Sequence, residues 1–213
     1  MNLAILGPQG SGKGTQAEKV SKKYNLYYFE MGQFLRNLAK SKPEIDEIIN
    51  KRGVLLEDNV VFDLLKNELE GKNIYSNILF DGYPRSIRQY ELISEFLQSK
   101  GSKIDKVIYL ELPDEEAIKR LSARRIDNKT GEIYNLITNP PPVGVNQQGL
   151  LQRPDDQPEA IGQRLKLYHS TTAPLVEHLS DKNLVIKIDG TKSIDAIFNQ
   201  ICIQLEGVVN GNN

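Results

Sequence analysis

A glycine-rich segment near the amino terminus constrains this chain most strongly. It reads GPQGSGKGT over residues 7–15 and directly follows the apolar run Leu3–Leu6, which predicts a buried strand. Glycine permits the backbone conformations in which successive N–H groups point at one anion, and a helix that begins there adds unpaired donors. Lys13 adds a positive charge suited to the outer phosphates of a nucleotide. The segment therefore predicts a phosphate-binding loop, and a plain glycine-rich turn is the weaker interpretation.

Short apolar runs alternate with longer amphipathic stretches along the rest of the chain. Apolar runs of this length, separated by helix-length stretches, are typical of a parallel sheet that is covered on both faces. The expected strands are residues 3–6, 27–29, 78–80, 107–110 and 184–188. The sequence therefore predicts an α/β fold of three layers, with a parallel five-stranded sheet and helices on both faces.

Several helices have recognisable start signals. We expect Asp114 to cap a helix that follows Pro113, with Ile118 and Leu121 facing inward. A second helix should begin at Pro158, because Ile161, Leu165 and Tyr168 share one helical face, and Ser193 should cap the last helix. The tail over residues 208–213 is expected to fray.

Two segments interrupt the alternation of strands and helices. Residues 30–56 combine several short helical patterns around Pro43, and residues 126–152 contain the run Asn139-Pro140-Pro141-Pro142. The second segment is too long for an ordinary connection, which favours a lid or binding flap. We predict a discontinuous core of residues 1–29, 57–122 and 157–213, with mobile insertions at 30–56 and 123–156.

Composition excludes several classes of protein. The chain has 27 Lys and Arg against 28 Asp and Glu, without the basic excess of most nucleic-acid-binding proteins. Its apolar runs are too short to span a bilayer, and no signal peptide is readable. Its single cysteine, Cys202, excludes an internal disulfide and a multi-cysteine zinc site. We expect a cytoplasmic protein with no nucleic-acid or membrane partner.

The loop departs from the general pattern because Gly14 stands where a hydroxyl residue usually follows the lysine. In this it resembles the adenylate kinase branch of the nucleoside monophosphate kinases. The resemblance continues through residues 32–36 (GQFLR), 81–86 (DGYPRS), 124–125 (RR), 131–134, 139–141, 153–156 (RPDD), 164 and 189–192 (DGTK). It implies a monophosphate-binding segment over 30–56 and a long lid over 123–156. It also implies a monomer that reversibly transfers the γ-phosphate of Mg-bound ATP to AMP, giving two ADP.

The site that the resemblance implies is built mainly from arginines, since guanidinium groups bind phosphate oxygens in pairs. The implied catalytic residues are Lys13, Arg85, Arg124, Arg153 and Arg164. The implied ATP contacts are Gly10, Ser11, Gly12, Lys13, Gly14, Thr15, Arg120, Arg124, Ile133, Tyr134 and Lys192. The implied AMP contacts are Met31, Gly32, Arg36, Leu55, Leu56, Gly82, Tyr83, Arg85, Gln89, Arg153 and Arg164.

No general base is required, because the acceptor phosphate is largely ionised near neutral pH. We therefore interpret His169 and His178 as ordinary helix residues. Asp81 follows an expected strand, where a carboxylate holds Mg²⁺ through water, although an Asp before a glycine also forms turns. The lid has no cysteines and so no zinc site, and Asp127 with Thr130 is a candidate hydrogen-bonded substitute.

Base selection rests on fewer residues. Gln89 favours AMP, because pyrimidine monophosphate kinases tend to have asparagine at this position. Met31 and Gln9 depart from the family pattern, and Met31 removes a hydroxyl donor beside the expected monophosphate. Three alternatives remain: a UMP/CMP kinase, a nucleotide-binding module without transfer, and a P-loop hydrolase. An assay of phosphate transfer from ATP to a panel of nucleoside monophosphates separates these alternatives.

Overall fold

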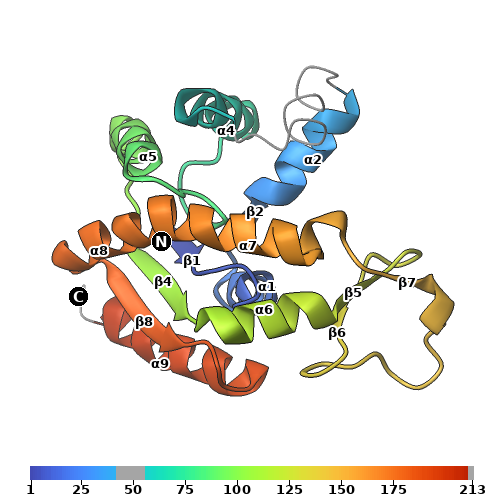
Figure 1. The fold of residues 1–213 in the computed structure, drawn as a ribbon. Coiled ribbons are helices and arrows are strands. Elements are labelled where there is room, and N and C mark those ends of the chain that lie inside the picture. Colours follow the sequence, from blue (N-terminus) through green and yellow to red (C-terminus); the bar gives the residue numbers. More distant parts are fainter. Residues whose placement is uncertain (42–55, 211–213) are drawn as a thin grey trace.

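The computed structural model describes residues 1–41 and 56–210, and its centre is a five-stranded parallel sheet (Figure 1). The strand order is β2-β3-β1-β4-β8, and every neighbouring pair is parallel. The strands are β1 (Leu3–Leu6), β2 (Tyr27–Glu30), β3 (Ile78–Asp81), β4 (Lys106–Glu111) and β8 (Val185–Asp189). The predicted fold class is confirmed. Because all five strands run the same way, their carboxyl ends meet at one edge of the sheet.

Helices cover both faces of this sheet. Alternate residues of a strand point to opposite faces, so Ala4 and Leu6 join one hydrophobic cluster and Leu3 and Ile5 join another. The first face is covered by α4 (Asp58–Lys72), α5 (Ile87–Ser99) and α8 (Ala173–Asp181), and the second by α1 (Lys13–Tyr24) and α9 (Ile194–Asn210). In Figure 1, α4 and α5 lie at the top and α9 at the bottom, with the sheet between them. This double cover explains why the strands read as continuous apolar runs.

The remaining helices lie toward the carboxyl edge of the sheet. They are α2 (Met31–Ser41), α6 (Asp114–Ala123) and α7 (Pro158–Leu167). A third hydrophobic cluster, which includes Leu121 and Leu165, packs α6 against α7. A π-helical turn over Tyr168–Thr172 joins α7 to α8, so the two helices form one continuous rod (Figure 1).

A small antiparallel sheet projects from the core at the right of Figure 1. Its strands, in the order β6-β5-β7, are β5 (Arg124–Asp127), β6 (Ile133–Asn135) and β7 (Leu150–Leu151). One 3-10 turn, Gln147–Gly149, precedes β7, and another, Pro154–Asp156, follows it. The Asp127 carboxylate accepts hydrogen bonds from the backbone N–H groups of Lys129 and Thr130, which closes the first turn. Thr130 in turn accepts from the backbone of Glu132. Asp127 and Thr130 thus order the turn between β5 and β6 through hydrogen bonds.

Local details differ from several sequence expectations. Pro113, and not Asp114, occupies the N-cap of α6, and Asp114 contacts His169 instead. Ile118 faces outward with 45% of its surface exposed, whereas Leu121 is buried as expected. Ser193 does accept from the first turn of α9, and that helix continues to Asn210, into the tail that was expected to fray.

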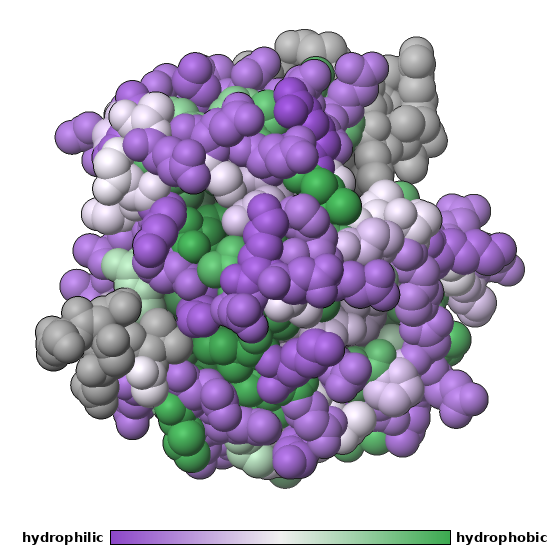
Figure 2. Space-filling view, turned by 90° about the vertical axis from the view of Figure 1, so that its left-hand side faces the viewer, coloured by the Kyte–Doolittle hydropathy of each residue, from purple (hydrophilic) through white to green (hydrophobic). Residues whose placement is uncertain are grey.

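In the segment over 30–56, Glu30 ends β2 and α2 follows over Met31–Ser41; the expected short helices around Pro43 fall on residues 42–55, which lie outside the described residues. Within the described ranges, no helix combines the length and apolar character needed to cross a membrane. Figure 2 shows a face dominated by hydrophilic residues with hydrophobic groups between them, which is the normal mixture on a folded protein.

Candidate active site

The glycine-rich loop connects β1 to α1 at the carboxyl edge of the sheet. Gly7 and Gly10 have φ values of 148° and 85°, which L side chains rarely adopt. A Cβ atom on Gly7 would lie 2.5 Å from the carbonyl oxygen of Leu110, and one on Gly10 would lie 3.0 Å from that of Ala117. The loop therefore packs too closely against the end of β4 and against α6 to tolerate side chains at these positions. The helix α1 begins directly at Lys13.

Lys13 folds back over this loop. Its Nζ donates hydrogen bonds to the carbonyl oxygens of Gly7 and Pro8, at 2.7 and 2.8 Å. Burial lowers the pKa of Lys13 to about 7, and Asp81 opposes this shift whereas Arg85, Arg164 and Arg124 add to it. Because these arginines come from different elements, the lysine marks the point where their charges converge. An anion at this point would relieve the repulsion among them.

Among the side chains at the loop and the start of α1, the Ser11 hydroxyl can donate to such an anion, whereas a glutamine amide oxygen can only accept. Within the described ranges, the buried side-chain oxygens Ser11 Oγ, Gln9 Oε1 and Gln16 Oε1 have no hydrogen-bond partner. Unpaired buried polar atoms are uncommon and costly in folded proteins. Ser11 is completely buried, whereas Gly12 and Thr15 are exposed at the start of α1. The loop thus combines unpaired polar atoms with accessible backbone.

The Asp81 carboxylate lies beside this loop. It ends β3, is 6% exposed, and accepts a hydrogen bond of 3.0 Å from the hydroxyl of Tyr28. Burial raises the pKa of Asp81, and the charge of Lys13 and the Tyr28 hydrogen bond oppose the shift. Gly14 lies against it, since a Cβ there would be 3.6 Å from Asp81 Oδ2.

The residues fit a hydrated Mg²⁺ better than a metal held by protein alone. Within the described ranges, no group of three or more His, Cys, Asp or Glu side chains could hold a metal ion. Mg²⁺ does not need such a group, because it keeps several waters and takes one or two carboxylates plus substrate phosphates. Asp81, a hard oxygen ligand beside the loop, meets that requirement.

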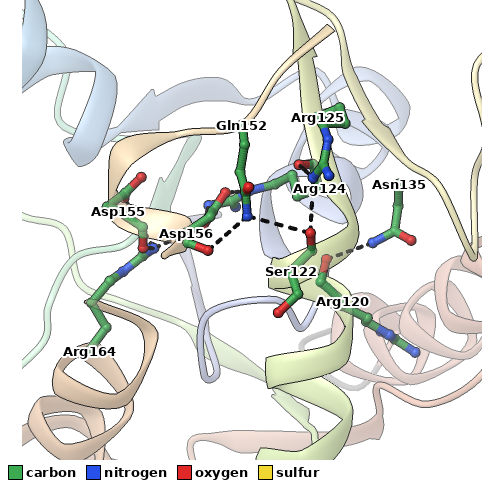
Figure 3. Close-up of polar contacts among 9 residues, drawn as sticks. All are labelled: Arg120, Ser122, Arg124, Arg125, Asn135, Gln152, Asp155, Asp156 and Arg164. Atoms are coloured by element: carbon green, nitrogen blue, oxygen red, sulfur yellow. Dashed lines mark hydrogen bonds and ion pairs between the residues drawn. The ribbon is translucent and has the colours of Figure 1, made fainter. Parts of the chain in front are cut away.

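On the lid side, two arginines share one buried carboxylate (Figure 3). Asp156 is completely buried and accepts from Nε and Nη2 of Arg124 at 2.7 and 2.5 Å, and from Nη1 of Arg164 at 3.3 Å. Arg164 also pairs with Asp155 at 3.1 Å, and Gln152 donates to the backbone oxygen of Asp156. Asp156 therefore sets the positions of an arginine from β5 and an arginine from α7.

The other implied phosphate ligands are less constrained. Arg36 pairs with Glu30 at 3.0 Å, and Arg85 Nε donates to the Gly82 carbonyl at 2.8 Å. For Arg153, no hydrogen bond or ion pair of the side chain is found within residues 1–41 and 56–210. Desolvation lowers the pKa of Arg153, and the charges of Arg124 and Arg36 lower it further, so these three cations lie near one another.

The residues expected around the acceptor base lie on α2, α5 and the Asp81–Ser86 turn. Gln89 is buried, and its amide accepts from the backbone N–H of Arg85 and donates to Asp58, both at 2.7 Å. Met31 is 2% exposed and belongs to the hydrophobic core, as does the fully buried Tyr83. Gly32 and Gly82 each lie against an arginine, namely Arg36 and Arg85. Leu56 packs on the same core, and Leu55 lies outside the described residues.

The residues expected around the donor base are spread over α6, β6 and the turn after β8. Arg120 donates to the carbonyl of Gly190 at 2.9 Å and to Glu116 at 3.0 Å. Ile133 is half exposed, and Tyr134 is buried with its hydroxyl on Glu132. Lys192 is exposed in the turn that precedes α9. The charges of Arg85, Arg124 and Arg164 thus reach Lys13, whereas the residues expected around the donor base lie on separate elements.

Sequence reasoning missed residues that support the site from behind. The Tyr28 hydroxyl holds Asp81, and the Asp58 carboxylate holds Gln89. The Asp156 carboxylate holds Arg124 and Arg164. Asp156 belongs to a recognised motif but carried no assigned role. Tyr28 and Asp58 had no signal, because their importance comes from strand pairing and helix packing.

A parallel sheet with a glycine-rich loop at its carboxyl edge, a lysine on that loop and arginines around it define a P-loop nucleotide-binding phosphotransferase. Comparison with known proteins narrows the class. A sequence model of the family described as adenylate kinase matches residues 5–184. The chain therefore belongs to the adenylate kinase family.

Curated relatives match nearly the whole chain. The adenylate kinase of Methanothrix thermoacetophila is 37% identical over 208 residues, covering 94% of this chain and 96% of that protein. The adenylate kinase of Salinibacter ruber is 35% identical over 204 residues, covering 94% and 96%. The adenylate kinase of Clostridium botulinum (strain Eklund 17B / Type B) is 33% identical over 210 residues, covering 95% and 97%.

Proposed function

We infer that the protein transfers the γ-phosphate of ATP to AMP, reversibly, to give two ADP. One arrangement carries this inference in a chain of the adenylate kinase family: Lys13 folds over the phosphate-binding loop, and Arg85, Arg124 and Arg164 lie near enough for their charges to lower its pKa. A protein that only bound ATP would not need cations on both sides of the loop. Phosphoryl transfer between two nucleotides needs them, because charge on both phosphate chains must be neutralised while they approach.

The chain's own residues supply positioning and positive charge. The donor phosphates are held by the loop over residues 10–15, which includes Lys13. The acceptor phosphate is held by Arg36 and Arg85. Arg124, Arg153 and Arg164 close over the group in transfer, where guanidinium donors stabilise charge that spreads over its oxygens. The acceptor phosphate attacks in its ionised form, so no side chain has to remove a proton.

Asp81 would hold Mg²⁺ through water beside the donor phosphates. When bound, the ion neutralises charge on the β- and γ-phosphate oxygens. Asp81 is suited to this because Tyr28 fixes its Oδ2 and Lys13 lies near.

The two bases occupy opposite sides of the phosphate chain. Arg120, Ile133, Tyr134 and Lys192 contact ATP, and Met31, Gly32, Leu55, Leu56, Gly82, Tyr83 and Gln89 surround AMP. Residues 30–56 form the monophosphate-binding segment and residues 123–156 form a lid. Closure of the lid excludes water, which would otherwise accept the γ-phosphate. We further propose that the protein is a cytoplasmic monomer.

A coupled assay of ADP production tests the proposal. ATP and Mg²⁺ are supplied with AMP, UMP, CMP or GMP, and AMP should be the best acceptor. Lys13→Ala should lose about 100-fold or more of the activity, the usual cost of removing a charged group from the transition state. Preference for UMP or CMP would indicate a pyrimidine kinase, ADP without any acceptor a hydrolase, and ATP binding without transfer a binding module. Each of these three results refutes the proposal.

A further inference from the structure

The rod formed by α7 and α8 contains a feature that the proposed reaction does not yet explain. Between the two helices, Tyr168–Thr172 adopt π-helical geometry, with one more residue per turn than an α-helix would have. Such turns are rare and are frequently found at functional sites. Arg164, which pairs with Asp156, lies two turns earlier on the same rod.

Two adjacent threonines in this turn behave differently. Thr171 Oγ1 donates to the Leu167 carbonyl at 2.7 Å, four residues back, which is the usual bond of a threonine inside a helix. Thr172 Oγ1 instead leaves its own helix and donates to the Arg85 carbonyl at 3.0 Å. Thr172 is 6% exposed, so its end of this part-buried bond lies inside the protein.

The Thr172 bond completes the restraint of Arg85. The N–H of Arg85 donates to the side chain of Gln89, and Arg85 Nε donates to the Gly82 carbonyl. Thr172 restrains the other backbone polar group, the Arg85 carbonyl. Both backbone polar groups of Arg85 are thus held by side chains of two different helices, α5 and the α7–α8 rod. A shift of this backbone would move the guanidinium that is proposed to hold the acceptor phosphate.

We propose that Thr172 is a positioning residue for Arg85, and that the π-helical turn exists to aim its hydroxyl at the Arg85 carbonyl. The inference rests on the proposed function, because it gives Arg85 the acceptor phosphate. One rigid element then sets two cations: it carries Arg164 directly and holds Arg85 through Thr172. The spacing between the acceptor-side and lid-side cations is fixed by a single helix.

The test compares three variants. Thr172→Val keeps the shape of the side chain and removes the hydroxyl, Thr172→Ser keeps the hydroxyl, and Thr171→Val removes the neighbouring hydroxyl that does not reach Arg85. Thr172→Val should lower kcat/KM for AMP by about 10-fold or more, because small misplacements of a catalytic group are costly. KM for ATP should stay within about twofold, as expected for a group that acts on one substrate. Thr172→Ser should keep most of the kcat/KM for AMP that Thr172→Val loses. Thr171→Val should have the same kinetic constants as the unmodified protein.

Calorimetric titration with AMP alone gives a readout that does not need turnover, and Thr172→Val should weaken that binding. Thr172→Ala replaces Thr172→Val if the latter does not fold. The proposal is overturned if Thr172→Val matches Thr171→Val in AMP affinity, or if it impairs ATP and AMP equally. If the unmodified protein itself does not phosphorylate AMP, the proposed function fails; an active protein that is insensitive at position 172 refutes the positioning role alone.

Discussion

Replacement of Asp156 by asparagine should lower the free energy of unfolding of the protein. The carboxylate is completely buried and accepts three guanidinium bonds, two from Arg124 and one from Arg164. Asparagine has almost the same size, but only its oxygen can accept. Its amino group would face guanidinium donors, and the two cations would lose the negative charge between them.

The magnitude follows from these contacts. Hydrogen bonds to charged groups contribute about 1.5–3 kcal/mol each, and removing one member of a buried ion pair costs about 3–5 kcal/mol. The side chains of Arg124 and Arg164 are 18% and 25% exposed, so solvent screens part of this loss. We expect the free energy of unfolding to fall by about 2–4 kcal/mol, or roughly 5–15 °C in Tm for a chain of this size.

Asp155→Asn is the matched control. Asp155 is 50% exposed and pairs only with Arg164, so its loss should cost less than about 1 kcal/mol. Urea unfolding followed by circular dichroism measures both variants, and the coupled assay measures their activity. Asp156→Asn should also lose about 10-fold or more in kcat, because Arg124 and Arg164 are no longer held in place. Equal stability of the two variants would refute this reasoning.

Two further predictions concern Lys13 and Asn2. Bound ATP phosphates should raise the pKa of Lys13 from its lowered value of about 7. At about pH 8.5, ATP binding should therefore be accompanied by uptake of a proton, and ATP affinity should fall as the pH rises above 7. Calorimetry in buffers of different ionisation enthalpy should detect this uptake, and Lys13→Arg should abolish it. Between pH 7 and 10.5, the Lys13 amine is protonated in the unfolded chain and largely deprotonated in the folded one. Since the unfolded state binds more protons in this range, Lys13 should make the ligand-free protein more stable as the pH rises. Asn2→Ala should lower the free energy of unfolding in urea by about 3–5 kcal/mol. The Asn2 side chain is 1% exposed; its amide accepts from the Ile78 N–H and donates to the Tyr75 and Lys103 carbonyls. KM values should not change.

The fold was largely predictable because its signals are local. A strand buried on both faces must be apolar throughout, so the runs at residues 3–6 and 78–80 identify themselves. The glycine-rich loop is equally local, since the backbone conformation it needs is available mainly to glycine. Helix ends were less predictable: Pro113 took the cap expected of Asp114, and Ile118 faces solvent. Such details depend on which neighbour a helix packs against.

The supporting residues of the candidate site could not have been predicted in the same way. Nothing in the sequence near Tyr28 indicates that its hydroxyl meets Asp81, which is 53 positions away. Likewise, Thr171 and Thr172 are the same residue type in adjacent positions, yet only one of them reaches Arg85. Both threonines lie in the π-helical turn, and only the folded structure shows which hydroxyl leaves the helix.

The sequence by itself determined the parallel α/β fold, the phosphate-binding loop with Lys13, and the family, because strand burial and loop conformation act through neighbouring residues. The tertiary structure alone decided which groups hold the arginines: Asp156 for Arg124 and Arg164, and Thr172 with Gln89 for Arg85. These contacts join segments far apart in the chain. Their energies depend on burial and on distances of about 3 Å, which exist only once the chain has folded.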